Sequence, residues 1–486
     1  QHYKDYNYGT GTHLHGRNIV FPTEFLHGLY DGGHGAGLED YWKQMQYNPI
    51  SAGGFLWCFS DEGVVRNDLE GMIDTDGNHA PDGIVGPFRE KEGSFYTVRE
   101  LWSPVFFEKK FITNQFDGSF IVENRYHFTN LNQCSFEYEF ATMPKPGEQL
   151  KAIVAQGKMI LPDIPADSKG RLRIELPDNW GAADILYIRA FDPHGREIYQ
   201  WSWQVKTPAQ VTDELIKHQY TFKHKDFGFY ETQDEVILYA GTILARFGKE
   251  TGILFEVKSD NMVIPIKNGP VLCEGEPNIK GNKVTETDSA IILEIFHEMP
   301  VKHHRWIMYP NGLLKLEYSY WPGNYTDFMG VSFDFPERMI KGLRWFGSGP
   351  YRVWKNRMAG NMINVWNNDY NNTITGEGKL IYPEFKGYFK DLYWAEIDAL
   401  PKSFRVFCSN EDVFLRMLTP DKPKNARNDY TSPPFPTGDI SFMHGITPIG
   451  TKFRNPEKMG PMGDKHLFMN YWRRFSKDLD LYFDFQ

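Results

Sequence analysis

The sequence predicts a multidomain, mainly β protein in which a short α/β segment is followed by two β-sandwiches. Its 486 residues are too many for one compact core and suggest about two to four domains. Up to residue 103, short apolar runs alternate with stretches in which apolar residues recur at helical spacing. From Pro104 onwards, short runs alternate apolar and polar residues between turn residues, which is typical of antiparallel sheets.

Two apolar runs in the first segment, residues 18–24 and 53–59, are expected to form short buried strands. A helix is expected between them. Its apolar face would be formed by Leu38, Tyr41, Trp42 and Met45. After a loop rich in Asp and Gly, Ser94 is positioned to cap a second helix on which Val98 and Trp102 share a face. This order of strands and helices indicates the tail of an alternating β/α fold.

Three domains and a connection are expected. Residues 1–103 form the α/β segment, and residues 104–207 have the size and short strands of one immunoglobulin-like β-sandwich. Residues 208–218 are expected to be a linker. Residues 219–486 contain many predicted strands and turn signals such as Asn311-Gly312, with no convincing long helix, and are long enough for a large antiparallel β-sandwich.

The α/β segment is too short to be a complete domain. Parallel strands need hydrogen-bonded neighbours on both sides and helices outside, and a (β/α)8 barrel takes about 250 residues. The segment supplies about two such strand and helix units. We therefore interpret it as the C-terminal part of a (β/α)8 barrel, with the remainder on a separate polypeptide or outside this sequence.

The composition excludes several classes of partner. The formal net charge is −10 and no basic block is present, which argues against nucleic acid and anionic membranes. Aromatic residues make up 16% of the chain, a share that suits sugar stacking but is also found in large β-sandwiches. The four cysteines, Cys58, Cys134, Cys273 and Cys408, are widely spaced and are expected to be buried free thiols.

No apolar run is long enough to span a bilayer. The first residues, polar and rich in His and Tyr, do not resemble a secretory signal. A periplasmic or secreted location is expected, without a signal in the sequence to support it.

One carboxylate is the first candidate for chemistry. Glu24 ends an apolar run and is followed by His27 and by a glycine-rich stretch, residues 28–37. A Glu at the C-terminal mouth of a buried barrel strand is well placed to act on a sugar. Trp57 stands near the end of the second apolar run, and Asp82 follows an acidic loop.

The motifs around these residues resemble glycoside hydrolase family 2, the β-galactosidase family. The resemblance begins with Glu-Phe-Leu-His at residues 24–27 and Gly-Gly-Phe-Leu-Trp at residues 53–57. Further matches follow in the same order at residues 38–42, 82–85, 124–130, 343–350 and 382–384. The resemblance implies the end of the catalytic barrel, the sandwich that follows it and the large C-terminal sandwich of such enzymes.

On this resemblance, Glu24 corresponds to the catalytic nucleophile, His27 to a contact for a sugar hydroxyl and Trp57 to the aromatic floor of the glycone subsite. Retaining hydrolysis needs two carboxyl groups about 5 Å apart. Nothing in the chain matches the family's acid/base Glu, so we expect it from the N-terminal half of the same enzyme, as a protein partner. The substrate would be an oligo- or polysaccharide that ends in a β-linked neutral hexose, most simply galactose.

Asp82 departs from the family pattern. β-Galactosidases have an Asn there, near the sugar's 6-hydroxyl and a sodium ion, so a monovalent or divalent cation near Asp82 is the cofactor to be tested. β-Glucuronidases have at about this point a Lys that grips the sugar carboxylate, and an Asp would repel a uronate. A neutral hexose is favoured, with β-glucuronide and β-mannoside enzymes as alternatives.

Each candidate also has a purely structural interpretation. Glu24 would be an ion-paired strand-end residue, His27 a loop cap, Trp57 a core residue and Asp82 part of a solvated turn. Weaker candidates are Asp61 and Glu62 for a second carboxylate, Asp31 and His34 for the rim of the site, and Phe442 or His444 for the aglycone. The glycine spacings lack a full nucleotide fingerprint and predict no phosphate site.

Two functions are consistent with these observations. The first is a retaining exo-β-glycosidase. The second is a non-catalytic carbohydrate-binding or scaffold protein whose partial barrel is vestigial. A Glu, a His and a Trp at positions typical of a barrel mouth favour the enzyme.

Overall fold

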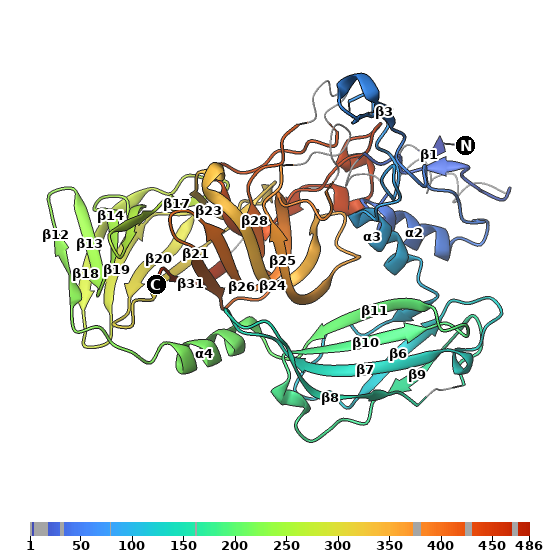
Figure 1. Cartoon of the computed structure of the whole chain (residues 1–486), viewed down its shortest axis with the longest axis horizontal. Coiled ribbons are helices and arrows are strands. Elements are labelled where there is room, and N and C mark those ends of the chain that lie inside the picture. Colours follow the sequence, from blue (N-terminus) through green and yellow to red (C-terminus); the bar gives the residue numbers. More distant parts are fainter. Residues whose placement is uncertain are drawn as a thin grey trace.

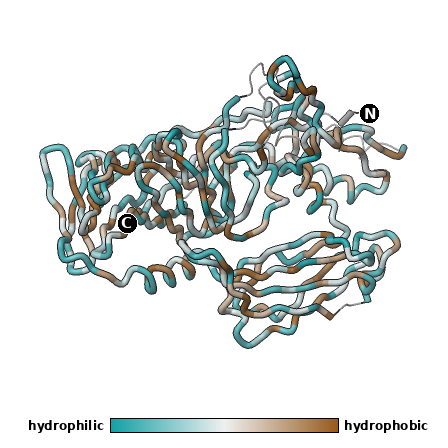
Figure 2. The backbone as a smooth tube through the Cα atoms, in the orientation of Figure 1, coloured by the Kyte–Doolittle hydropathy of each residue, from teal (hydrophilic) through white to brown (hydrophobic). Residues whose placement is uncertain are grey.

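The computed structural model describes residues 2–3, 18–29, 34–77, 79–160, 163–372, 381–422, 430–468 and 475–486. It consists of a small N-terminal α/β part, a compact β-sandwich and a large antiparallel sheet (Figure 1). The mainly β character that the sequence predicts is confirmed. Hydrophobic and hydrophilic residues alternate along many strands (Figure 2), as in β14 (Ile243–Gly248), where every second side chain is buried.

The N-terminal part contains short extended segments that pair in parallel. β2 (Glu24–Phe25) pairs with β1 (His2–Tyr3), and single parallel bridges join Val20 to Ser51, Phe25 to Leu56 and Ser60 to Val85. A short hairpin, β3 (Val64–Arg66) and β4 (Met72–Asp74), follows. No (β/α)8 barrel is evident in the described part of the chain, because each parallel contact spans only one or two residues.

Two helices support this part, as the apolar spacing predicts. α2 (Leu38–Tyr47) starts after Gly37, whose φ of 76° lies in the left-handed region, and buries three residues of the expected face: Leu38, Tyr41 and Met45. α3 (Gly93–Leu101) begins one residue before Ser94, with Glu92 as its N-cap, so the predicted cap is shifted by two positions.

The two apolar runs are only partly buried, contrary to the expectation of buried strands. In residues 18–24 and 53–59 one face packs into the apolar cluster around Phe25, whereas the other is open. The open face carries five large exposed side chains: Ile19, Phe21, Phe55, Trp57 and Phe59. Within the described residues no further strand covers this face.

Residues 105–204 form a sandwich of two antiparallel sheets. One sheet has the order β11-β10-β7-β8 and the other β5-β6-β9. The strands are β5 (Val105–Phe107), β6 (Ser119–Asn124), β7 (Ser135–Thr142), β8 (Ala152–Lys158), β9 (Ser168–Arg173), β10 (Ile185–Phe191) and β11 (Glu197–Gln204). Its core is built around aromatic rings, among them Phe107, Phe120, Phe136, Phe140 and Trp203.

The stretch predicted as a linker is a helix, α4 (Pro208–Gln219), which joins the sandwich to the large sheet (Figure 1). Thr207 caps it: its hydroxyl accepts the N–H of Gln210, and the Gln210 side chain accepts the Thr207 N–H, as in a capping box. Val211 and Leu215 pack into an apolar cluster that also contains residues of the sandwich and of the large sheet.

The large antiparallel sheet confirms the prediction that the last part of the chain is rich in strands. Its described strands are β12 (Phe227–Glu231), β13 (Glu235–Ala240), β14, β15 (Leu254–Ser259), β16 (Met262–Ile264), β17 (Lys267–Leu272), β18 (Ile279–Glu286), β19 (Ile291–His297), β20 (Val301–Met308), β21 (Leu314–Tyr320), β23 (Met329–Asp334), β24 (Ile340–Val353), β25 (Met362–Asp369), β26 (Gly387–Ala399), β27 (Phe404–Cys408), β28 (Phe414–Met417), β29 (Ile440–Gly445) and β31 (Lys477–Asp484). Additional pairings such as β17 with β23 and β21 with β31 fold the sheet back on itself around one apolar core.

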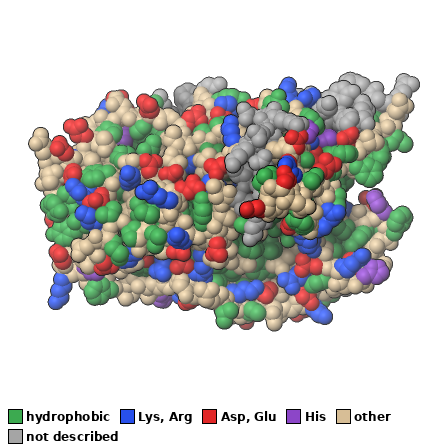
Figure 3. Space-filling model, turned by 45° about the horizontal axis from the view of Figure 1, so that its top comes forward, with side chains coloured by type: hydrophobic (Ala, Val, Ile, Leu, Met, Phe, Trp, Pro, Cys, Tyr) green, Lys and Arg blue, Asp and Glu red, His purple; other side chains and the backbone are tan. Residues whose placement is uncertain are grey.

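All four cysteines are free thiols, as expected. Cys134 and Cys408 are buried, whereas Cys58 and Cys273 are only half-buried, contrary to the expectation. Among the described residues, no helix combines the length and apolar character needed to cross a membrane. Acidic and basic side chains are intermingled over the face shown in Figure 3, without a basic block.

Candidate functional site

Glu24 is the first residue of β2, and its carboxylate lies beside the imidazole of His27. The Glu24 Oε2 to His27 Nε2 distance is 3.1 Å, and the two side chains are 23% and 12% exposed. The carboxylate is therefore partly open to solvent and has an imidazole as a close neighbour. A partly exposed carboxylate with a fixed neighbour suits either a nucleophile or a surface ion pair.

Aromatic rings surround His27. The ring of Trp57 is stacked on it with centroids 5.8 Å apart, and the ring of Phe453 meets it edge-on at 5.0 Å. Trp57 reaches this place because its backbone N–H donates to the carbonyl of Phe25 across the parallel pairing. Trp57 and Phe453 are 40% and 37% exposed, so both rings present part of a face to solvent.

Asp82 lies beside this group and is almost completely buried. Its Oδ2 accepts from Lys452 Nζ at 2.9 Å, and its Oδ1 is 3.5 Å from the Cys58 thiol. Its carbonyl accepts from the Cys58 N–H and from the His34 imidazole. Burial first, and then the Asp82 carboxylate, raise the pKa of the Cys58 thiol to about 12. The interpretation of Asp82 as a solvated turn residue is therefore wrong.

Lys452 and Phe453 are site residues that the sequence reasoning missed. They belong to a loop between β29 and β30 (His466–Leu467), 370 positions away from Asp82. The Lys452 N–H donates to the carbonyl of His27 at 3.0 Å, and the Met462 N–H donates to Asp40 of α2 at 3.0 Å. Several contacts thus fix this loop against the N-terminal part, although no local motif marks Lys452 or Phe453.

The expected aglycone residues from the same region are engaged elsewhere. Phe442 is fully buried in the core of the large sheet. His444 lies 3.1 Å from the Tyr320 hydroxyl and 3.1 Å from the Asp478 carbonyl, and burial lowers its pKa to about 4. From the loop after β29, Lys452 and Phe453 contact His27 instead.

Of the two rim candidates, only His34 lies in the described part of the chain, and it does not line a rim. His34 is completely buried, and burial lowers its pKa to about 4, so its neutral ring donates from Nε2 to the Asp82 carbonyl. This hydrogen bond supports the loop that contains Asp82. Asp31 lies outside the described residues.

The two candidates for a second carboxylate differ from each other. The Asp61 carboxyl is buried and accepts the Gly83 N–H at 2.8 Å, and burial raises its pKa to about 7. Glu62 is exposed on the surface. A raised pKa suits a general acid, but the buried Asp61 carboxyl faces the protein interior.

A bound metal ion finds little support at this site. No group of three or more His, Cys, Asp or Glu side chains suited to a metal occurs in the described ranges. Asp82 already holds a cation, because the Lys452 ammonium occupies its carboxylate. A metal ion beside Asp82 therefore does not fit these residues, contrary to the expectation.

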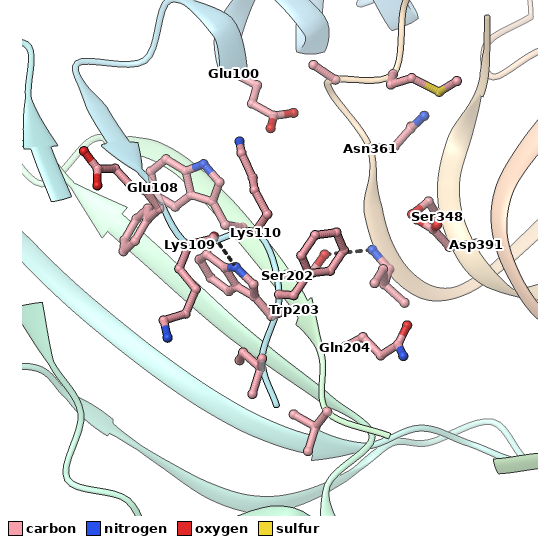
Figure 4. Close-up of a pocket in the computed structure, with 18 of the residues that line it drawn as sticks. Glu100, Glu108, Lys109, Lys110, Ser202, Trp203, Gln204, Ser348, Asn361 and Asp391 are labelled. Atoms are coloured by element: carbon pink, nitrogen blue, oxygen red, sulfur yellow. Dashed lines mark hydrogen bonds between the residues drawn. The ribbon is translucent and has the colours of Figure 1, made fainter. Parts of the chain in front are cut away.

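A separate cleft of about 1310 Å³ lies between α3, the small sandwich and the large sheet (Figure 4). Glu100 of α3, Trp203 of β11 and Asp391 of β26 are among its lining residues. None of the four candidate site residues lines it. The Glu24 site and this cleft are therefore different features.

The chain is similar to two β-galactosidases over part of its length. It is 24% identical over 254 residues to the enzyme of Actinobacillus pleuropneumoniae, a match covering 51% of this chain and 21% of that protein. It is 28% identical over 136 residues to that of Priestia megaterium, covering 26% of this chain and 12% of that protein. The chain thus spans about a fifth or less of these relatives. No family model matches the sequence.

Two solved glycosidase structures overlap with part of the chain. A β-D-mannosidase from Dictyoglomus thermophilum has a TM-score of 0.18 at 12% identity, covering 50% of this chain and 24% of that one. An exo-chitosanase from Amycolatopsis orientalis has a TM-score of 0.19 at 9% identity, covering 74% and 32%. Scores this low do not indicate a shared overall fold.

Proposed function

We propose that this chain is part of a retaining exo-β-glycosidase of the β-galactosidase type, with Glu24 as the nucleophile. The observation that carries the proposal is the Glu24–His27 pair, 3.1 Å apart, beside the exposed ring of Trp57. The partial similarity to two β-galactosidases supports it. Residues 1–103 would contribute the C-terminal part of the catalytic barrel, and a Glu from outside this sequence would act as acid/base.

Glu24 attacks the anomeric carbon of the terminal sugar, and a Glu24–sugar ester bond forms while the glycosidic bond breaks. The leaving oxygen takes a proton from the acid/base Glu. Water, which gives its proton to the same Glu, then attacks the anomeric carbon and releases the sugar and the Glu24 carboxylate. His27 holds the carboxylate in place and offers its ring to a sugar hydroxyl, and Trp57 stacks on the apolar face of the pyranose.

The charges favour a neutral hexose. Asp82 and Lys452 form a buried pair whose net charge is zero, so neither is available to bind a sugar carboxylate. A uronate would need an uncompensated cation at this place. We therefore propose a neutral hexose, with galactose as the first candidate and β-mannosides as the next.

Trapping the covalent intermediate tests this proposal. The native sample is first checked by intact mass for a second polypeptide, and is then incubated with a 2-deoxy-2-fluoro-β-galactoside whose leaving group is dinitrophenolate. We expect the fluorosugar on the peptide that contains Glu24, and turnover of nitrophenyl β-galactoside that is lost in Glu24→Gln. Glu62→Gln, which changes an exposed Glu nearby, should retain turnover. A label on another residue, or full turnover by Glu24→Gln, contradicts the assignment.

One observation favours the alternative function, a carbohydrate-binding or scaffold protein. The Glu24–His27 contact is also an ordinary ion pair, and an exposed Trp binds sugar without any chemistry. In that case Glu24→Gln would bind galactose as well as the wild type, and no nitrophenyl glycoside would be hydrolysed by the pure, folded protein.

A further inference from the structure

We infer that the ammonium group of Lys452 is the built-in cation of this site: it stands beside Asp82 in place of a metal ion and makes sugar binding independent of sodium or magnesium. The inference rests on the proposed function for the role of the sugar. It goes beyond that function by naming Lys452 as a positioning residue and by excluding a metal requirement.

The first argument is the occupancy of Asp82. Lys452 Nζ is 2.9 Å from Oδ2, and the thiol of Cys58 is 3.5 Å from Oδ1. Both carboxylate oxygens therefore already have a neighbour. A metal ion on the same carboxylate would stand a few ångströms from the ammonium, where two positive charges repel each other strongly at low dielectric.

The second argument is burial. The side chains of Asp82 and Lys452 are only 2% and 10% exposed. A buried carboxylate requires a compensating charge, and a buried ammonium requires the same. The pair satisfies both without an ion from solution, so Asp82 and Lys452 together carry no net charge before any ligand arrives.

The third argument is that the backbone fixes Lys452 in place. The Thr451 hydroxyl accepts the N–H groups of Phe453 and Arg454 at 3.2 and 3.1 Å, which forms a tight turn around Lys452. The Lys452 N–H bonds the His27 carbonyl, and the Phe453 ring contacts the His27 ring. The same turn thus positions the ammonium at Asp82 and an aromatic edge at His27, next to the Glu24 ion pair.

The test compares galactose binding and thermal midpoints in choline, sodium and magnesium chloride at equal ionic strength, after treatment with a chelator. Tryptophan fluorescence reports galactose binding. For the wild type we expect the same affinity in all three salts, within about twofold, and the same midpoint. Lys452→Arg keeps a positive charge and should bind galactose nearly as well as the wild type.

Two variants separate the positive charge from simple charge balance. Lys452→Met should lose about tenfold or more in galactose affinity in choline chloride and should have a lower midpoint. The double variant Asp82→Asn/Lys452→Met contains no unpaired buried charge and should recover the midpoint. It should still bind galactose weakly, because the cation is missing.

Several results would overturn the inference. They are a wild-type affinity or midpoint that rises with sodium or magnesium, normal galactose binding by Lys452→Met, and full recovery of galactose binding in the double variant. If the wild type binds no galactose in any salt, the proposed function fails instead. The midpoints then still decide the cation question, because they require no sugar: an unchanged wild-type midpoint and a lower Lys452→Met midpoint support the built-in cation.

Discussion

Trp57 has 40% of its surface exposed although it stands in an apolar run. An indole this exposed contributes little to core packing, and its ring is stacked on His27 beside Glu24. Trp57→Ala should therefore weaken galactose binding about tenfold while the thermal midpoint changes little. Isothermal calorimetry and a thermal scan measure the two effects.

Two further variants control for the role of the Trp57 ring. Trp57→Phe retains a ring and should retain most of the affinity. Phe59→Ala removes a neighbouring exposed ring and should leave galactose binding unchanged. If Trp57→Ala binds galactose as tightly as the wild type, the Trp57 ring is an exposed surface group with no role in sugar binding.

Asp61 provides a prediction about pH and stability. Burial raises its pKa from an ordinary value near 3.8 to about 7, so the folded protein keeps a proton that the unfolded chain releases. The free energy of unfolding therefore has its full value, as far as Asp61 is concerned, below pH 4. It falls as the pH rises from 4 towards 7, by about 1.4 kcal/mol per pH unit at most. Asp61→Asn should not show this fall. Its free energy of unfolding should therefore increase relative to that of the wild type as the pH approaches 7.

Urea unfolding of both proteins from pH 4 to 8 measures the Asp61 effect. Glu62→Gln, a change at the exposed neighbour, should follow the wild type across this range. A constant difference in the free energy of unfolding between Asp61→Asn and the wild type would show that Asp61 is ionised in the fold at all of these pH values.

Three of the site residues could be predicted to lie close together. Glu24 and Trp57 stand in two apolar runs whose neighbouring residues are joined by parallel bridges, and His27 follows Glu24 by three positions. Their catalytic and binding roles stay predictions. Lys452 and Phe453 could not be found in this way. Neither residue type is unusual in a loop, and their contacts with Asp82 and His27 depend on how the large sheet is placed against the N-terminal part.

At the scale of elements, strong apolar periodicity predicted α2 and α3, and the beginning of α3 was shifted because Glu92 is its N-cap. The helix α4 was missed, although Thr207, Pro208 and Gln210 form a readable N-terminal signal. Its apolar side chains are few, because the helix packs on only one side.

The capping box of α4 gives a prediction at this scale. Thr207→Ala leaves the N–H of Gln210 without its acceptor and should lower the free energy of unfolding by about 1 kcal/mol. Thr207→Ser retains the hydroxyl and should stay close to the wild type. Urea denaturation compares the three proteins, and equal stability for Thr207→Ala would show that the cap is dispensable where the helix is held by packing.

The two apolar runs show how far burial can be inferred from sequence. Residues 18–24 and 53–59 are as apolar as fully buried parallel strands, yet one face of each is exposed. Apolar runs indicate which faces can be buried, and tertiary neighbours decide which faces are. For this reason the sequence alone predicted a barrel segment, whereas the described residues show only short parallel contacts.

At the scale of the whole molecule, the small sandwich and the large sheet share an apolar cluster. It contains Met143 and Tyr187 of the sandwich, Leu215 of α4, and Phe346 and Trp394 of the large sheet. The Tyr187 hydroxyl also donates to the carbonyl of Ile363 at 2.7 Å, so a buried polar contact joins the same two parts. Domains joined by a hydrophobic interface tend to unfold together.

We therefore expect one cooperative thermal transition for these two parts, seen alike by circular dichroism and tryptophan fluorescence. Phe346 stacks on Tyr393 at 4.0 Å within the shared cluster, so Phe346→Ala should cost about 3–5 kcal/mol and separate the transition into two. Phe120→Ala removes an equally buried ring from the core of the small sandwich alone. Because the interface is intact in that variant, its single transition should move to lower temperature as a whole. If Phe120→Ala instead shifts only part of the signal, the two parts fold independently and the shared cluster is a contact without cooperativity.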